Sequence, residues 1–352
     1  MRKHKTLTLI IFLTLGLFNY TSNANSLNIA LFLPFDSSSY SEMAESIHNG
    51  INDSLNNFNL NYRIEKFHES HSLKDNLRTF NKINSKKYDI IIGPLINSSV
   101  IQLEKEILNI KQKILLLNSD SLLRNKFQNN KNIYIYGFNL EEEVLSIVDE
   151  IKLKADQIYV VHNNSKISQK ILLKFITKIE NYFDLKSQVL EFEKIKQNLK
   201  PFKEKLIEQL DEDDDLTIIF FSFLNNQDSR SFRPYLGSKI HFYSTFLINN
   251  DRYDKLQKYD LQNAIFYEMP IVFLGDEQLE NKYNTINIPL NNVLRRFYAV
   301  GYDSILIFKA IENKSLGNIN GTSGIINFSN NFFSRKGNLV KINNGKLKKL
   351  AQ

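Results

Sequence analysis

The chain has 352 residues, of which 42% are hydrophobic, and it carries a net charge of +7 at pH 7. This length predicts about two domains, and the hydrophobic fraction is typical of a globular protein rather than a disordered one. The absence of Cys excludes disulfides, thiolate zinc sites, iron–sulfur clusters, a cysteine nucleophile and a lipid-modified N-terminal Cys. The chain has no run of five or more Lys or Arg residues, so neither nucleic acid nor an anionic membrane surface is predicted as a partner.

Residues 1–24 have the layout of a secretory signal peptide. Three basic residues lie near the start, and an apolar run of 12 residues follows at 7–18. Small residues occupy the −3 and −1 positions of a cut after Ala24, as expected at a cleavage site. The alternative is a retained signal anchor, although about 20 apolar residues are needed to span a bilayer. No later stretch approaches that length, so we expect an exported protein with no membrane span after cleavage and no lipid anchor.

Short apolar strands alternate with amphipathic helices along the first part of the mature chain. We expect strands at 27–33, 62–67, 88–92, 113–117 and 133–136. The apolar spacing predicts helices near 43–55, 73–83 and 100–110, and another that begins near residue 140. Ser39 and Glu42 have the spacing of a capping box at the start of the first helix.

A second alternating series follows. We expect strands at 157–161, 188–192, 216–221, 240–243 and 264–267, and helices at 168–182, 201–210 and 293–311. The tail changes to a period of two, with a strand at 324–328 and a hairpin of 339–342 and 346–350. Asn344-Gly345 at the centre of this hairpin is a strong turn signal.

Strands of this kind joined by helices are typical of parallel sheets covered on both faces, and two such series predict two α/β lobes. In these lobes, ligands bind beyond the carboxyl ends of the strands. The loops of interest are therefore 34–40, 93–98, 118–121 and 162–166.

Two of these loops carry candidate motifs. The loop from Pro34 to Ser39 offers hydroxyls and helix N–H groups to a polar or anionic ligand, and a plain capping loop is the alternative. It is no phosphate loop, because the chain has neither a GxxxxGK[ST] nor a GxGxxG pattern. Gly93-Pro94 ends a buried strand; turn formation alone explains this pair, and only its position at the predicted cleft makes it a candidate.

The residues predict no enzyme, no metal site and no cofactor. There is no G-x-S-x-G elbow, and Ser, Asp and His form no recognisable catalytic arrangement. His68 and His71 are close in sequence, but no third His accompanies them. The acidic run at 211–215 lacks the ligand spacing and central Gly of an EF-hand and is interpreted as a solvated turn.

A series of segments carries a resemblance to a known family. They are IALFLPF at 29–35, HNGI at 48–51, DIIIGPLINSSV at 89–100, ILLLNSD at 114–120, YGFNLEEEV at 136–144, LQNAIFYEMP at 261–270, RRFYAVGYDS at 295–304, GTSGIINFSNN at 321–331 and INNGKL at 342–347. In this order they resemble the type I periplasmic-binding-protein fold of the penicillin-binding-protein activators, the LppC/LpoA-type family. The early segments are shared with amino-acid-binding proteins of transporters, whereas the later ones are more typical of the activators.

The resemblance implies an α/β fold with two lobes, each a mainly parallel sheet flanked by helices. Three interlobe crossovers would lie near Phe138, Pro270 and Asn313. Lobe 1 would comprise 27–138 plus 271–314, and lobe 2 would comprise 139–270 plus 315–352.

The resemblance also implies where a ligand would bind. Transporter-type relatives hold ligands through hydroxyls and backbone amides after the first, third and fourth strands. The corresponding candidates in the interlobe cleft are Ser37, Ser38, Ser39, Gly93, Pro94, Asn97, Asn118 and Ser119. Phe35 and Asp36 stand where such relatives often carry small residues, which departs from the usual pattern of an amino-acid site.

The family implies a non-enzymatic role in the periplasm, where its members bind a class A penicillin-binding protein and stimulate peptidoglycan synthesis. Lipid-anchored members carry a Cys after the signal peptide, and long members carry a helical-repeat domain before this fold; we expect a short form without either. The leading hypothesis is therefore a periplasmic regulator of a class A penicillin-binding protein. The alternative is a solute receptor of an ABC transporter or sensor that closes its lobes on an amino acid or a similar small polar ligand.

Overall fold

The computed structural model describes residues 26–118, 121–150, 155–212, 215–250, 258–274, 278, 281–282 and 287–350. The predicted signal peptide and the candidate Ser119 lie outside these residues. In the described part of the chain, no helix is both long and apolar enough to cross a membrane.

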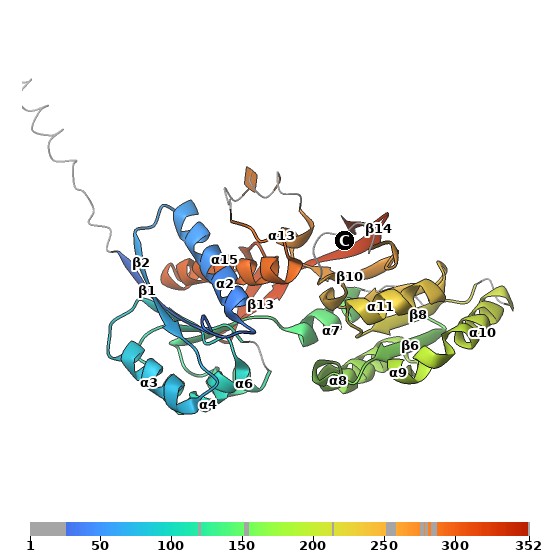
Figure 1. Ribbon diagram of the computed structural model, residues 1–352, viewed down its shortest axis with the longest axis horizontal. Helices are drawn as coiled ribbons and strands as arrows, with labels where there is room; N and C mark the ends of the chain where they lie inside the picture. Colours follow the sequence, from blue (N-terminus) through green and yellow to red (C-terminus); the bar gives the residue numbers. More distant parts are fainter. Residues whose placement is uncertain are drawn as a thin grey trace, which may run out of the picture.

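Two mostly parallel sheets, one in each lobe, lie side by side along the long axis of the molecule (Figure 1). Among the described residues, the first sheet has eight strands in the order β11-β12-β13-β5-β4-β3-β1-β2. Its strands are β1 Leu27–Leu33, β2 Tyr62–His68, β3 Ile90–Ile92, β4 Ile114–Leu116, β5 Ile133–Tyr136, β11 Ile319–Asn320, β12 Ile325–Ser329 and β13 Phe332–Lys336. All neighbours from β13 to β2 are parallel, and β11 and β12 extend the sheet with antiparallel pairing.

In the part of the chain that the structure describes, the second sheet has seven strands in the order β15-β14-β10-β9-β8-β6-β7. Its strands are β6 Gln157–His162, β7 Gln188–Glu191, β8 Ile218–Ser222, β9 His241–Ser244, β10 Ala264–Glu268, β14 Asn338–Asn343 and β15 Lys346–Lys349. The strands from β10 to β7 are parallel, and the β14–β15 hairpin adds antiparallel to β10. These two sheets confirm the predicted two-lobed α/β fold.

Helices cover both faces of each sheet. In the first lobe, α2 (Ser41–Asn57) and α15 (Asn292–Glu312) cover one face, while α3 (Leu73–Asn84), α4 (Asn97–Gln102), α5 (Glu104–Leu108) and α6 (Ser121–Phe127) cover the other. Alternation along β1 accounts for this arrangement, because Ile29 and Leu31 face α2 and α15 whereas Ala30 and Phe32 face the other layer. The helix predicted at 100–110 is interrupted, and α4 and α5 meet at Leu103.

The second lobe has the same layered construction. On one face lie α7 (Leu140–Glu150) and α8 (Lys166–Phe183). On the other lie α9 (Phe192–Ile195), α10 (Leu199–Glu212), α11 (Asn226–Phe232) and the 3₁₀ segments η1 (Lys196–Asn198), η2 (Arg233–Leu236) and η3 (Phe246–Asn249). The short helix α13 (Pro270–Phe273) follows β10.

Helices α2 and α15 pack with their backbones in contact in the first lobe (Figure 1). A Cβ added at Gly50 would lie 2.1 Å from the Tyr298 carbonyl oxygen, and one at Gly301 would lie 2.0 Å from the Ile47 carbonyl oxygen. Only glycine allows this approach at either position. The capping box expected at Ser39 and Glu42 is wrong, because α2 begins after Tyr40 and no side chain caps its first turn.

The chain passes between the lobes after β5, after β10 and between β13 and β14. We expected the third crossover near Asn313 and the whole tail from residue 315 in lobe 2. That expectation is wrong for β11 to β13, because β13 pairs with β5 and buries Phe333 in the core of the first lobe. Only β14 and β15 join the second sheet. We therefore propose lobe 1 as 27–138 plus 271–336 and lobe 2 as 139–270 plus 338–350.

Candidate functional site

A cavity of about 450 Å³ lies on the first lobe, beyond the carboxyl ends of β3, β4 and β5. Its lining residues are Tyr40, Met43, Leu95, Ile96, Asn97, Ser98, Leu117, Asn118, Phe138 and Phe297. The volume is in the range of small-molecule sites. None of these described side chains is charged, so this part of the wall offers amides and hydroxyls among apolar groups.

Of the residues predicted for this cleft, Asn97 and Asn118 line the cavity. The three serines of the loop after β1 lie outside its lining and shape the turn that precedes α2. The Ser37 carbonyl accepts from the Ser41 amide at 3.0 Å, and the Ser37 hydroxyl accepts from the Ser39 amide at 3.4 Å. Ser38 is exposed. A role of these serines in ligand binding stays a prediction.

Gly93 and Pro94 position the cavity wall without lining it. Gly93 has a φ of +110°, and a Cβ at this residue would lie only 2.0 Å from the Phe32 carbonyl oxygen of β1. The Pro94 carbonyl accepts from the Leu117 amide at 3.2 Å. The identity of Gly93 therefore follows from the close approach of two backbones, which places the following residues, 95–98, at the cavity.

The buried carboxylate of Glu69 stabilises the same loop, residues 95–98, by hydrogen bonds to its backbone. Its two oxygens accept from the amides of Leu95 and Ile96, both at 2.8 Å, and the residue is 0% exposed. Burial raises the pKa of Glu69 to about 7, although these two hydrogen bonds act in the opposite direction. Sequence reasoning did not predict this role of Glu69, because the residue lies in a polar run at the end of β2 where no pattern marks it as buried.

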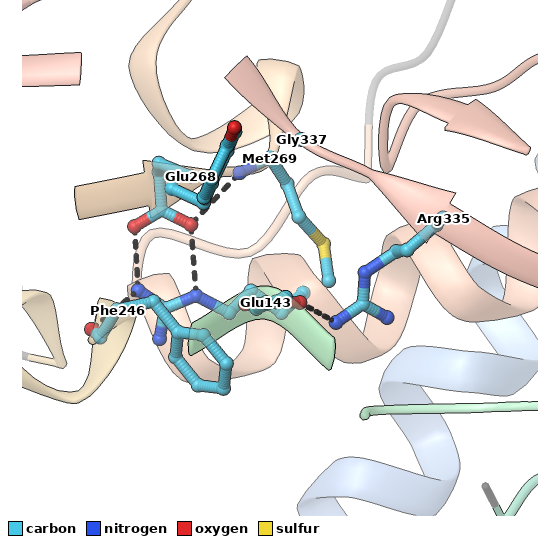
Figure 2. Close-up of a pocket in the computed structure, with 8 residues that line it drawn as sticks. Glu143, Phe246, Glu268, Met269, Arg335 and Gly337 are labelled. Carbon is cyan, nitrogen blue, oxygen red and sulfur yellow. Dashed lines mark hydrogen bonds and ion pairs between the residues drawn. The ribbon is translucent and has the colours of Figure 1, made fainter. Parts of the chain in front are cut away.

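The hinge beside the cavity contains two buried ion pairs that join the lobes (Figure 2). The first links Arg296 of α15 to Glu268 at the end of β10. Arg296 donates from Nε to Oε1 at 3.0 Å and from Nη2 to Oε2 at 2.6 Å, with 2% and 0% of the two side chains exposed. Asn249 donates its side-chain amide to Glu268 at 2.8 Å, and Arg296 donates to the carbonyls of Phe246 and Asn249, both at 3.1 Å. A helix of the first lobe is thereby fixed to η3 and β10 of the second.

The second pair links Arg335 at the end of β13 to Glu143 of α7, and Figure 2 shows the guanidinium directed at the carboxylate. Only 3% and 12% of these side chains are exposed. Arg335 also donates to the carbonyl of Gly137 at 3.2 Å. Because β13 lies in the first sheet and α7 packs on the second, this pair also crosses between the lobes.

Aromatic rings fill the space between the two pairs. The Phe138 ring lies 4.7 Å from the Phe297 ring and 6.3 Å from the Phe246 ring, measured between centroids. The Arg296 guanidinium lies over Phe246 at 4.6 Å, and that of Arg335 lies over Phe138 at 4.8 Å. The cavity enclosed at this hinge is only about 10 Å³, near the minimum for one water. The hinge is therefore tightly packed.

Sequence reasoning also missed these hinge residues, although a signal was present. Glu268 follows an apolar strand, and Arg296 lies in the first turns of a largely apolar helix. A charge in a largely apolar segment needs a partner when it is buried. The two residues fall in the YEMP and RRFY segments that carried the family resemblance, which did not by itself pair them.

No family model and no curated protein matches the chain. Full-length LpoA from Haemophilus influenzae is similar in structure, with a TM-score of 0.70 and 14% sequence identity over 93% of this chain, which spans 59% of the LpoA chain. The LpoA C-domain from the same organism, described as a regulator of PBP1A, has a TM-score of 0.66 and 16% identity and covers 92% of this chain and 100% of its own. A putative branched-chain amino acid ABC transporter protein from Chromobacterium violaceum has a TM-score of 0.69 and 17% identity, over 89% of this chain and 99% of its own. These likenesses confirm the expected resemblance at the level of the type I periplasmic-binding-protein fold.

Proposed function

We propose that this chain is a non-enzymatic periplasmic regulator that binds a class A penicillin-binding protein and stimulates its peptidoglycan synthesis. The observation that carries the proposal is the hinge. The ion pairs Arg296–Glu268 and Arg335–Glu143 join the lobes at buried positions, and aromatic rings pack between the two pairs.

A receptor that closes around a solute changes the angle between its lobes at the hinge. Breaking a buried ion pair leaves an uncompensated charge and costs about 3–5 kcal/mol. Two such pairs across one hinge favour a fixed interlobe angle. A fixed two-lobed body suits a protein that presents a constant surface to a partner, and the likeness to the LpoA C-domain supports the same function.

The test uses the expected mature chain, residues 25–352, with the purified periplasmic part of a class A penicillin-binding protein from the same organism. Binding is followed by biolayer interferometry, and glycan polymerisation is followed in parallel samples. We expect saturable binding and faster polymerisation. Heat-unfolded chain serves as the control and should do neither. No binding at tens of micromolar together with an unchanged rate would refute the proposal for that partner.

A solute receptor remains the second candidate, and the cavity of about 450 Å³ favours it. A ligand at a hundredfold excess over its dissociation constant would stabilise the chain by about 2.7 kcal/mol. Thermal unfolding with a panel of amino acids and muropeptides measures this effect. Ser98→Trp, which narrows the cavity, should abolish the shift, whereas Ser38→Trp outside the lining should preserve it. No shift with any ligand of the panel would count against the receptor.

A further inference from the structure

The C-terminal hairpin presents a lysine face, which we define as Lys341, Lys346 and Lys348. Lys341 of β14 lies directly opposite Lys348 of β15, and Lys346 lies opposite Asn343. Since side chains alternate along a strand, all three lysines lie on the same side of the hairpin. Like charges directly opposite each other destabilise an antiparallel pair. The repulsion between Lys341 and Lys348 therefore lowers the stability of the hairpin.

In the described part of the chain, the lysine face lacks the counter-ions that several other lysines of this lobe have. Lys174, Lys178 and Lys194 each pair with a carboxylate at 2.7 Å. Within the described ranges, no such pair involves a member of the lysine face, and Lys346 and Lys348 are exposed. The positive charge of this surface is thus available to an outside partner.

The hairpin that carries the lysine face is firmly held. Val340 and Ile342 are fully buried in the core of the second lobe. The Asn263 amide donates to the Ile342 carbonyl at 2.9 Å, and the Asn344 amide donates to the Gln262 side chain at 2.9 Å. The turn residues Asn344 and Gly345 have φ values of +52° and +69°, as a tight hairpin turn requires. The lysines are consequently presented on a preorganised surface.

β15 is also an edge strand. Among the described strands it ends the second sheet and pairs with β14 alone, so no described strand takes up the backbone groups on its other side. An edge of this kind can accept a further strand from another chain, with backbone hydrogen bonds for affinity and side chains for specificity. Lys346 and Lys348 are about 7 Å apart along the strand, which matches alternate residues of an added strand.

We propose that β15 is a docking edge for an extended acidic segment of a partner protein, which adds as a further strand and places carboxylates beside Lys346 and Lys348. This surface is separate from the cavity and the hinge. Its partner is defined by chemistry alone, as a β-strand with Glu or Asp at alternate positions.

The test measures binding of the mature chain to a fluorescent peptide of four Thr-Glu repeats by anisotropy. Two matched peptides serve as controls, one with Gln for Glu and one with a methylated backbone. We expect saturable binding of the acidic peptide, at least tenfold weaker binding of both control peptides, and slower amide exchange at 346–349 in the complex.

The variant K346Q/K348Q should bind the acidic peptide at least tenfold more weakly. K200Q/K205Q, which removes the same charge from α10, should change the affinity less than twofold. Lys348→Glu alone is a second variant in case the double variant does not fold, and it should also weaken binding. No penicillin-binding protein takes part, so a negative result leaves the proposed function standing.

Three results would overturn the proposal: no binding at 1 mM peptide, equal loss in K346Q/K348Q and K200Q/K205Q, or full binding of the methylated peptide. A fourth would be self-association of K346Q/K348Q while the unmodified chain binds no acidic peptide. The lysines would then serve only to keep the edge from pairing with another copy of this chain.

Discussion

The cavity wall and the hinge share Phe138, yet charges are distributed in opposite ways in these two neighbouring regions. Among the residues that the structure describes, no charged side chain lines the cavity, whereas the hinge encloses two Arg–carboxylate pairs. A buried pair needs both partners and their hydrogen bonds, because either charge alone is costly away from water. An uncharged wall open to solvent has no such requirement. Single substitutions should therefore lower the free energy of unfolding most in the hinge and least in the cavity wall.

The largest effect is expected from Arg296→Met. This change leaves the Glu268 carboxylate buried without its cation and should lower the free energy of unfolding by about 3–5 kcal/mol. Urea unfolding of both proteins at pH 7 measures the difference. The control is the double variant R296M/E268L, which removes both charges and should recover part of the loss. A loss below about 1 kcal/mol in the single variant would mean that this pair does not fix the hinge.

The next effect concerns Glu69 and depends on pH. Its pKa is about 7 in the folded protein against an ordinary value of 4.5, so the folded state prefers the protonated form. The contribution of this group is most favourable below pH 4.5, and it is lost as the pH rises through 7, by about 3 kcal/mol. We therefore expect the wild type to lose stability relative to Glu69→Gln between pH 5 and pH 8.

Urea unfolding of Glu69→Gln and the wild type at both pH values provides this comparison, and Glu65→Gln is the matched control. Hydrogen bonds from Lys86 and Tyr88 lower the pKa of Glu65 from its ordinary value, in the opposite direction to the shift of Glu69. Its variant should differ from the wild type by the same amount at pH 5 and pH 8. A similar, flat difference for Glu69→Gln would show that Glu69 is ionised throughout this range.

A smaller effect is expected where charges are exposed. Lys348→Glu replaces a repulsion with Lys341 by an attraction across the hairpin. It should raise the free energy of unfolding by about 0.2–1 kcal/mol, the usual range for cross-strand pairs. Thermal unfolding at low and high salt checks this estimate, because an exposed pair is screened by salt and the gain should shrink. A destabilised variant would contradict the repulsion inferred for these lysines.

The smallest effect is expected on the cavity wall itself. The Ser98 side chain lines the cavity and is exposed. Ser98→Ala should change the free energy of unfolding by less than about 0.5 kcal/mol, as surface substitutions usually do. Ser99→Ala is the matched comparison on the same helix, because the buried Ser99 hydroxyl takes part in hydrogen bonds with Asn76 and Ser70. A larger loss at Ser98 than at Ser99 would contradict the view that the wall tolerates change.

The sequence was sufficient to predict the two-lobed fold, because the apolar runs of β1, β6 and β8 are continuous and the helices between them are amphipathic. The sequence was not sufficient to assign β13 to the sheet of the first lobe. The FFSRK segment has a short mixed pattern, and its pairing with β5 is a contact between residues nearly 200 positions apart. Local patterns cannot specify such a pairing, so the third crossover was expected too early.

The candidate site was predictable only in part. Asn97 and Asn118 follow buried parallel strands, and the rule that ligands bind beyond the carboxyl ends of such strands was enough to place them. Tyr40 and Phe297 line the same cavity from two helices whose relative position depends on the close packing of α2 against α15. The Arg296–Glu268 pair likewise depends on how the lobes dock, which no local pattern encodes.

The most direct test of a fixed interlobe angle is a distance measurement between the two lobes. The chain has no Cys, so cysteines can be introduced at two exposed positions, Ser38 in the first lobe and Asn164 in the second. Spin labels on these cysteines allow the distance between them to be measured by pulsed electron–electron double resonance. We predict one narrow distance distribution that amino acids, muropeptides and the penicillin-binding protein leave unchanged, and a broader one in Arg296→Met. Two populations in the unmodified hinge, or a shorter distance on addition of a small ligand, would contradict the fixed hinge and favour the solute receptor.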